Sequence, residues 1–333
     1  MAVRSRDPAT LLEAARGGDR GAIGRLLSFV ERGGDRAREV GRLTFPSSRE
    51  VESVVGITGA PGSGKSSLTD RLVTEARRSG GRIGVLAIDP SSPLSGGAIL
   101  GDRVRMQGHA GDEGVFVRSM ASRGHLGGLA LAAPEAIRVL VAVGIPRVIV
   151  ETVGVGQVEV DVAGAADTTV VVVTPGWGDS VQANKAGLLE IADIFVVNKA
   201  DRSGAAETRS DLEHMLDLDT NMGAWRPPVL LTSATVGDGV AELWEAIEEH
   251  GEHLGTTGEL DRRRAARLEG ELTAVLVRRL ERDVRGVADG AAWNAVRARV
   301  VSGTTDPYEA ASELLGALTA AVETETEGRS RSG

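Results

Sequence analysis

The sequence predicts an α/β fold built on a doubly wound, mostly parallel sheet, with helical extensions at the N-terminal and C-terminal ends of the chain. Three observations lead to this class. Short runs of β-branched residues are apolar on both faces, as expected for strands that helices cover on both sides. Longer segments with helical spacing separate these runs, which is the pattern of βαβ units. The strand signal ends near residue 256, where a purely helical segment begins.

The first fifty residues carry two short helical patterns, over 8–16 and 20–31, each followed by a pair of glycines. We therefore predict a small helical extension over 1–50, without a core of its own, and an α/β domain over 51–255. A run near residue 114, GVFVRS, is a candidate seventh strand. The six clearer strands are the runs SVVGIT, RIGVLAI, RVIVE, TTVVVVT, IFVVN and VLLTS, which begin near residues 53, 82, 147, 168, 194 and 228.

The last part of the chain has helical spacing over 258–285, 290–301 and 307–323, and no internal repeat occurs. We predict that residues 256–323 form a C-terminal arm that serves dimerisation. The final segment, 324–333, is short, polar and terminal, so we predict a disordered tail.

Composition excludes several classes of function. The net charge is −9 and only 3% of the residues are aromatic, so the chain lacks the features of a nucleic-acid-binding protein. It contains no apolar run long enough to span a membrane, and its first thirty residues lack the apolar centre of a secretory signal. Without cysteine it has no disulfide, thiolate metal ligand or thiol nucleophile. We expect a cytoplasmic protein that contacts neither membrane nor nucleic acid.

Lysine is rare in this chain. Of the 38 basic residues only Lys65, Lys185 and Lys199 are lysines, and the rest are arginines. A compact ammonium on a flexible stem differs physically from a planar guanidinium, so these are candidate positions where arginine cannot serve. Two of the three lie in the nucleotide motifs described next.

Residues 59–66, GAPGSGKS, match the phosphate-binding pattern G-x-x-x-x-G-K-[ST] between a strand and a helix. The backbone N–H groups of such a loop turn toward phosphate oxygens, and the helix N-terminus adds partial positive charge. We predict that Lys65 binds the β- and γ-phosphates and that the Ser66 hydroxyl binds Mg²⁺. The alternative is a glycine-rich surface turn. The predicted nucleotide-binding residues here are Gly59, Ala60, Pro61, Gly62, Ser63, Gly64, Lys65, Ser66 and Ser67.

Residues 198–201, NKAD, end the strand IFVVN in the N-K-x-D arrangement of GTPases. Asp201 is expected to accept hydrogen bonds from guanine N1–H and its exocyclic amine, which adenine cannot supply. Asn198 is expected to tie this loop to the phosphate loop, and the Lys199 stem to lie over the base. Further on, Ser233 and Ala234 follow a strand and resemble the loop whose backbone N–H contacts guanine O6. The alternative is a surface turn with solvated charges.

Carboxylates at three other places are candidates for the magnesium and hydrolysis site. Glu151 ends the strand RVIVE, where a P-loop NTPase holds Mg²⁺, and the segment TVGVGQ follows it. There Gly154 is expected to donate its N–H to the γ-phosphate, and Gln157 to orient water. Gln157 departs from the familiar D-x-x-G-Q spacing, which predicts slow hydrolysis by the free enzyme. Asp89 and Asp102 suit Mg²⁺ as well, with an Asp-Pro turn and a helix cap as their alternatives.

Four strings carry a family resemblance: GAPGSGKS, VLAIDPSSPLSGGAILGDRVRM, ETVGVGQVEVDVAGAAD and TPGWGDSVQANKAGLLEIADIFVVNKAD. Over about residues 50–250 the chain resembles the MeaB/ArgK family of P-loop GTPases. The resemblance implies a SIMIBI-class GTPase, homodimeric through helical extensions, that accompanies adenosylcobalamin-dependent methylmalonyl-CoA mutase. It implies gating of cobalamin loading and protection or reactivation of the mutase. Members have also been called arginine/ornithine transport ATPases or kinases, but nothing in this sequence supports transport.

The resemblance also assigns residues. It places the Mg²⁺ environment on Ser66, Asp89, Asp102 and Glu151, and switch loops near 89–107 and 151–163. A third loop, 175–187, would link the nucleotide state to the mutase. Lys185 lies in it, and we include Lys185 with Lys65, Glu151 and Gln157 among the candidate catalytic residues; a solvated helix lysine is the alternative. No D-x-H-x-x-G cobalamin motif occurs, so any cobalamin is expected on the partner.

Three other functions remain open at this point. A nickel-insertion GTPase would need metal ligands, and only His250 and His253 are close in sequence, at a spacing more typical of a helix surface. A small-molecule kinase would not need the guanine-reading NKAD. A nucleic-acid-binding module could use the arginine-rich segment 262–267, although the acidic charge favours a solvated helix face.

Overall fold

The computed structural model describes residues 5–90, 106–109, 111–122, 128–152, 164–176, 190–218, 223–288 and 291–316. The chain divides into two compact units, Met1–Leu268 and Glu269–Gly333. The boundary between the units falls inside helix α10 (Glu259–Ala288). The division of the chain at residues 50, 255 and 323 stays a prediction.

Within the described residues, the first unit is built on a seven-stranded sheet in the order β3-β2-β4-β1-β5-β6-β7. Every neighbouring pair is parallel. The predicted doubly wound, mostly parallel sheet is therefore confirmed, and the run near residue 114 is a strand. The strands are β1 (Ser53–Thr58), β2 (Ile83–Pro90), β3 (Val115–Ser122), β4 (Arg147–Thr152), β5 (Thr168–Val173), β6 (Ile194–Asn198) and β7 (Val229–Thr232).

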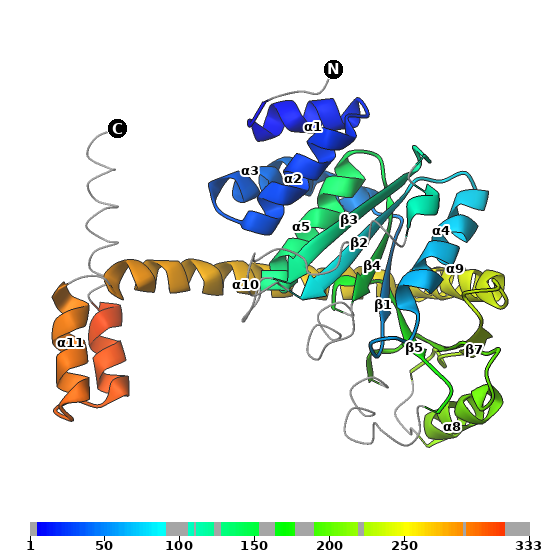
Figure 1. The fold of residues 1–333 in the computed structure, drawn as a ribbon. Coiled ribbons are helices and arrows are strands. Elements are labelled where there is room, and N and C mark those ends of the chain that lie inside the picture. Colours follow the sequence, from blue (N-terminus) through cyan, green and yellow to red (C-terminus); the bar gives the residue numbers. More distant parts are fainter. Residues whose placement is uncertain are drawn as a thin grey trace. The chain divides into compact units, whose positions relative to one another are not determined.

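Helices cover both faces of the sheet, because consecutive strand residues point to opposite sides. In β5, Val170 and Val172 are buried in the cluster that contains α4 and α9, whereas Val171 and Val173 are buried in the cluster that contains α8. Figure 1 shows α4 on one side of the strands and α5 on the other. These helices are α4 (Lys65–Arg78), α5 (Gly128–Ala142), α8 (Ala205–Asp217) and α9 (Val240–Thr257).

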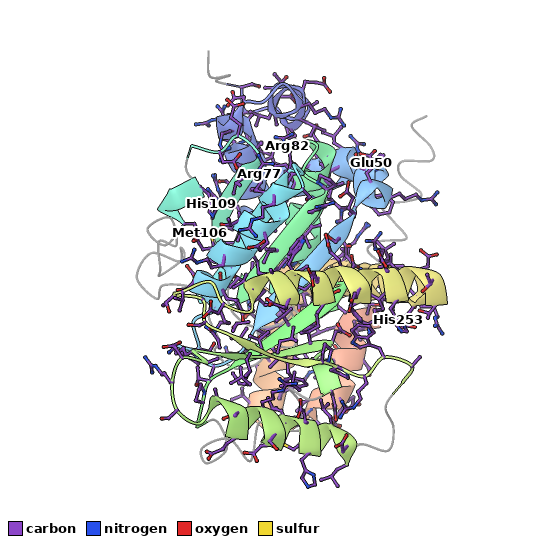
Figure 2. All side chains as sticks on the ribbon, turned by 90° about the vertical axis from the view of Figure 1, so that its right-hand side faces the viewer. Glu50, Arg77, Arg82, Met106, His109 and His253 are labelled. Carbon is purple, nitrogen blue, oxygen red and sulfur yellow. The ribbon has the colours of Figure 1, made fainter. Side chains whose placement is uncertain are left out.

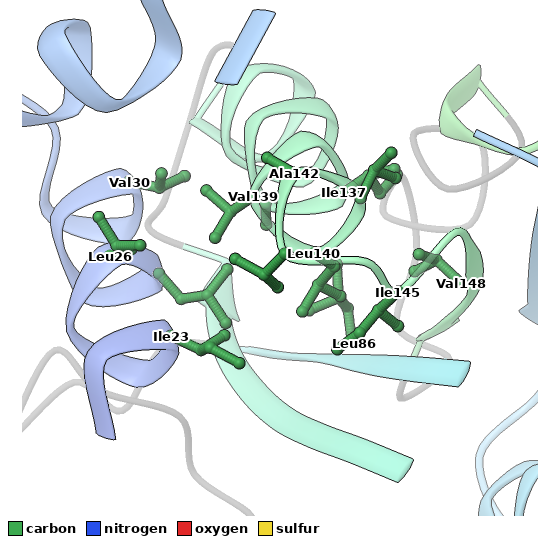
Figure 3. Close-up of a cluster of buried hydrophobic side chains, with 14 of the residues drawn as sticks. Ile23, Leu26, Val30, Leu86, Ile137, Val139, Leu140, Ala142, Ile145 and Val148 are labelled. Atoms are coloured by element: carbon green, nitrogen blue, oxygen red, sulfur yellow. The ribbon is translucent and has the colours of Figure 1, made fainter. Parts of the chain in front are cut away.

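The N-terminal helices share their core with the sheet. Two aspartates begin the first two helices: Asp7 accepts the Thr10 N–H at 2.9 Å, and Asp19 accepts the Ala22 N–H at 3.0 Å. The apolar face of α2 then packs toward α5 and β2, as Figure 3 shows for Leu26, Leu140 and Leu86. The helices are α1 (Pro8–Arg16), α2 (Arg20–Arg32) and α3 (Asp35–Thr44).

Arginines at the start of α10 join that helix to the N-terminal ends of the strands. Arg264 donates to Asp167 Oδ2 at 2.8 Å, and Arg267 also binds the Asp167 carboxylate. Arg263 Nη1 lies 3.0 Å from Asp193 Oδ1. The expected solvated helix face over 262–267 is therefore wrong for these three arginines. They compensate two buried carboxylates, and the nucleic-acid alternative loses the residues on which it depended.

The two carboxylates have opposite pKa shifts. Burial raises the pKa of Asp167, but the hydrogen bond from Arg264 and the charges of Arg267 and Arg264 outweigh burial and hold it below its ordinary value. For Asp193, burial dominates over the charge of Arg263, and its pKa is raised. Asp167 is therefore the more firmly ionised carboxylate of the two.

His250 completes this buried polar group. Its Nδ1 lies 2.9 Å from Thr168 Oγ1, and its ring centroid lies 4.7 Å from that of Trp225. Burial, and then the charge of Arg263, lower the pKa of His250 to about 4, so the imidazole is neutral at pH 7. The expectation of a surface pair His250–His253 is wrong for His250, which is fully buried. Within the described ranges, no cluster of three or more His, Asp or Glu side chains could hold a metal ion.

Replacing Asp167 by alanine should destabilise the fold by about 3 kcal/mol, because it leaves two partly buried arginines uncompensated. It also removes the acceptor of the Val54 N–H, which now lies 3.1 Å from Asp167 Oδ2. Urea unfolding measures the loss. Asp217→Ala is the matched control, since Asp217 pairs with Arg226 on the exposed surface.

The pH dependence follows from the lowered pKa. The stabilisation by Asp167 should be fully present above the ordinary carboxyl pKa and be lost as the pH falls through the lowered value. If Asp167→Ala proves no more destabilising than Asp217→Ala, the ion pairs of Asp167 with Arg264 and Arg267 contribute nothing to stability.

The second unit is helical where it is described. It contains the end of α10, the helix α11 (Ala291–Val301) and a helical stretch over 307–316. Among the residues that the structure describes, no helix combines the length and the apolar character needed to cross a membrane.

Candidate functional site

The loop 59–64 joins the end of β1 to α4 and passes very close to other backbone. Gly59 has a φ of +136° and Gly64 a φ of +91°. A Cβ on Gly59 would lie 2.1 Å from the Val172 carbonyl oxygen, and one on Gly64 would lie 2.4 Å from Asn198 Nδ2. Only glycine fits at these two positions, where the loop turns its backbone around the first turn of α4. This is the shape of a phosphate cradle.

Lys65 begins helix α4 and is 5% exposed. Its Nζ donates to the carbonyl oxygens of Gly59 at 2.7 Å and Ala60 at 2.9 Å. These bonds hold the ammonium inside the loop, where it lies close to any phosphate that the backbone N–H groups bind. The Lys65 ammonium thus lies within the phosphate loop, and its role toward the nucleotide stays a prediction.

The strand order places this loop at the centre of the sheet. β1 lies between β4 and β5, and the next strands along the chain, β2 and β6, lie outside them on opposite sides. The connection from β1 leads to β2 on one side, whereas the connection from β4 passes β1 to reach β5 on the other side. The strand order therefore reverses at β1, and its carboxyl end opens into the crevice where ligands of this architecture bind. The candidate residues at the ends of β2, β4 and β6 all reach the same edge.

Oxygen ligands gather beside the phosphate cradle. The Ser66 hydroxyl donates to Glu151 Oε1 at 2.5 Å, and both side chains are buried. Asp89 is the second-last residue of β2 and is 1% exposed. This strand pairs with β4 so that Ala87 lies opposite Glu151. A hydroxyl and two carboxylates are the donors that Mg²⁺ prefers beside phosphates. The residues present therefore fit a magnesium ion.

Asn198 connects the phosphate loop to the two loops of the predicted base site. Its Nδ2 donates to the Ser63 carbonyl at 2.8 Å, which is the tie that the sequence predicts. Its Oδ1 accepts from Thr232 Oγ1 and from the Ala234 N–H, both at 3.2 Å. One buried amide thus uses donor and acceptor to hold three segments together.

The NKAD loop presents its two charged side chains differently. Lys199 has a φ of +62°, and Nζ donates to the Gly62 carbonyl at 2.6 Å, so its stem crosses from one loop to the other. Asp201 is exposed and accepts from Ser233 Oγ at 2.7 Å. That hydrogen bond, with its own backbone N–H, lowers the pKa of Asp201. The carboxylate is ionised at neutral pH and can accept from two donors on a base.

Four candidate residues lie outside the described residues: Asp102, Gly154, Gln157 and Lys185. The same holds for most of the predicted loops 89–107, 151–163 and 175–187. Their roles remain predictions from the sequence.

One contact beside the site escaped the sequence analysis. The described segment 106–109 places Met106 in the core and His109 against α4 (Figure 2). His109 Nε2 lies 3.1 Å from the Asp70 carbonyl oxygen and 3.3 Å from Asp70 Oδ1. The segment that directly follows the predicted switch loop 89–107 is therefore held against the helix that carries Lys65. No local pattern could reveal a pair 39 residues apart.

A parallel sheet with a phosphate loop after its central strand and an N-K-x-D loop two strands away defines a P-loop GTPase. Comparison with known proteins agrees. The family model described as methylmalonyl-CoA mutase-associated GTPase MeaB matches residues 23–289. The chain belongs to the MeaB family, and it hydrolyses GTP with Mg²⁺ as that family does.

Relatives support this assignment, and one solved structure supports the fold. A Pyrococcus abyssi relative is 49% identical over 92% of this chain and 95% of its own length. The GTPase ArgK of Escherichia coli is 36% identical over 76% of this chain and 79% of its own length. The mouse methylmalonic aciduria type A homolog is 33% identical over 74% of this chain and 64% of its own length. The crystal structure of a LAO/AO transport system kinase, 24% identical, covers 96% of this chain and 100% of its own with a TM-score of 0.69, which shows a shared fold.

Proposed function

We propose that this GTPase is a chaperone of an adenosylcobalamin-dependent acyl-CoA mutase, with methylmalonyl-CoA mutase as the first candidate. It would gate loading of the cofactor and protect or reactivate the mutase. The family match carries the proposal, because its description names a mutase-associated GTPase and residues 23–289 include the whole candidate site. The name of the mouse relative, which refers to methylmalonic aciduria, supports the same client.

The residues of the site take these roles. The loop 59–64 with Lys65 holds the phosphates, and Ser66, Asp89, Asp102 and Glu151 hold Mg²⁺ directly or through water. A bound Mg²⁺ would neutralise charge on the β- and γ-phosphates. Gly154 donates to the γ-phosphate and Gln157 orients the attacking water. Cobalamin stays on the mutase. The guanine base is held by Asn198, Lys199, Asp201, Ser233 and Ala234.

An apolar stripe on α10 supports a homodimer as the working form. Leu272, Val275, Leu276 and Leu280 recur on one helix face at spacings of three and four residues, and each is at least 46% exposed. Apolar side chains at this spacing on a long helix are typical of a helix–helix interface. A second copy of the chain would cover the stripe with the same stripe of its own.

Chromatography of the full chain mixed with purified mutase tests the function. A complex should form in a nucleotide-dependent way, differing between GDP and a non-hydrolysable GTP analogue, and the free chain should elute with the mass of a dimer. The proposal fails if no acyl-CoA mutase binds in any nucleotide state. Phosphate release from GTP without a phosphorylated acceptor separates this function from the kinase alternative.

Lys185→Ala tests the link between nucleotide state and mutase. We expect basal hydrolysis within a few-fold of the parent and loss of most of the stimulation by mutase, because the 175–187 loop transmits a coupling of about 1–3 kcal/mol. Undiminished stimulation would leave Lys185 a surface lysine.

A further inference from the structure

Arg71 links the helix of the phosphate loop to the loop of the base site. It lies on α4, six residues after Lys65. Its Nε donates to the Ala234 carbonyl at 3.0 Å, and its Nη2 donates to the Thr235 carbonyl at 3.0 Å. Two donors of one planar guanidinium thus bind two successive carbonyls, a geometry that a lysine ammonium cannot reproduce.

The loop that Arg71 binds is a tight turn between β7 and α9. At its far end the backbone passes close to β7, since a Cβ on Gly239 would lie 2.0 Å from the Leu231 carbonyl oxygen. The Ser233 N–H donates to the Asp238 carbonyl and so closes the turn. Ser233 and Ala234 are buried on the side of β6, where Asn198 and Asp201 contact them. Thr235 is exposed at the outer side of the turn, and Arg71 binds its carbonyl there.

These carbonyl contacts set the direction of backbone donors. A peptide unit is planar and trans, so fixing the Ala234 carbonyl also fixes the N–H of Thr235, which points the opposite way. Fixing the Thr235 carbonyl likewise aligns the Val236 N–H, which donates to the Ser233 carbonyl at 3.1 Å. The guanidinium therefore orients the backbone N–H groups of Thr235 and Val236 from the side away from Asn198.

We propose that Arg71 is a positioning residue for guanine recognition, which holds the 233–235 loop so that the Thr235 N–H meets the base oxygen O6. The proposal rests on the assignment of Asp201 and this loop as the base-reading groups. Arg71 does not touch the base itself. It acts through the loop, and it joins base recognition to the helix that carries Lys65.

The test compares a nucleotide with O6 and one without it. GDP and 2-aminopurine riboside diphosphate share the 2-amino group and the phosphates, but the second lacks both O6 and the N1–H that Asp201 is expected to bind. The quantity compared is therefore the change in each affinity from the parent to the variant. In Arg71→Ala the affinity for GDP should fall about tenfold, since charge-assisted hydrogen bonds of a partly exposed group are lost. The affinity for the 2-aminopurine nucleotide should change less than twofold. Hydrolysis should show a raised KM for GTP with kcat nearly unchanged.

Two variants make the test specific. Arg71→Lys keeps the charge without the two-pronged geometry and should behave like Arg71→Ala. Arg78→Ala, which removes an exposed arginine paired with Glu75 on the same helix, should leave both affinities unchanged. Thermal unfolding of each variant shows whether α4 remains folded.

The outcomes separate this proposal from the assignment of the base site. Equal weakening of both nucleotides, or an unchanged preference for GDP, overturns the role of Arg71. If Asp201→Asn also leaves the preference for guanine unchanged, the base-site assignment fails as well. If Asp201→Asn loses the preference for guanine while Arg71→Ala keeps it, only the proposal for Arg71 fails.

Discussion

Lys65→Ala should reduce GTP turnover roughly a thousandfold, the effect expected when a preorganised cation beside the transferring phosphoryl group is removed. The ammonium is held at 2.7 Å and 2.9 Å from two carbonyls of the phosphate loop, so it is fixed in the loop before a nucleotide binds. The affinity for GTP should fall as well, because the phosphate charge is no longer balanced. Phosphate release under saturating GTP measures the first effect, and calorimetry measures the second.

Lys65→Arg should not restore turnover. The guanidinium is planar and larger than an ammonium, and the cradle around Lys65 is closed by Gly59 and Ala60. Arg78→Ala, on the last turn of the same helix, should keep the parental rate and shows that a changed charge on α4 is not itself harmful. Full turnover by Lys65→Arg would refute the placement of Lys65 at the phosphates.

Asp201→Asn should weaken GTP binding by roughly 100-fold and improve the binding of xanthosine nucleotides. The carboxylate accepts the Ser233 hydroxyl through Oδ1, and that bond lowers its pKa, so it offers negative charge to the two donors of guanine. An asparagine amide presents a donor where xanthine has an acceptor. The result is an exchange of preference between the two bases.

Competition binding with GTP, XTP and ATP measures this exchange. Asp211→Asn, at an exposed position of α8, should leave all three affinities unchanged. If the affinity of Asp201→Asn for XTP does not rise relative to its affinity for GTP, then Asp201 does not recognise guanine. The same follows if the parent binds ATP as tightly as GTP.

The sheet could be predicted because its sequence signal is local and repeated. Each strand is a short β-branched run buried on both faces, as in β5 and β6, and such runs in alternation with helices fit few other architectures. The helix boundaries Pro8–Arg16 agree for a similar reason, since Asp7 and Gly17 mark the two ends within a few residues. Helix α3 was not predicted, because half of its ten residues are charged and only Ala37, Val40 and Thr44 are buried.

The role of the arginine-rich segment 262–267 could not be predicted from the sequence. Residues 262–267 have the composition of a solvated helix, and composition carries no information on partners far along the chain. Asp167 lies about a hundred residues before Arg264 and Arg267, and burial of that carboxylate decides what the arginines do. His250 is a second case, since its helical spacing to His253 suggested a surface pair while the fold placed it beneath Trp225.

By itself, the sequence determined the class of the protein and most of its chemistry. The phosphate loop and NKAD are contiguous motifs, and their function depends on backbone geometry that a few neighbouring residues impose. Only the tertiary structure decided how the motifs are joined. Asn198 bonds to Ser63 and Ala234, Ser66 to Glu151, and Arg71 to the 233–235 loop, because the parallel sheet brings together segments that are 36 to 164 residues apart in the chain. Contacts of that separation depend on strand order, and strand order is a property of the folded sheet.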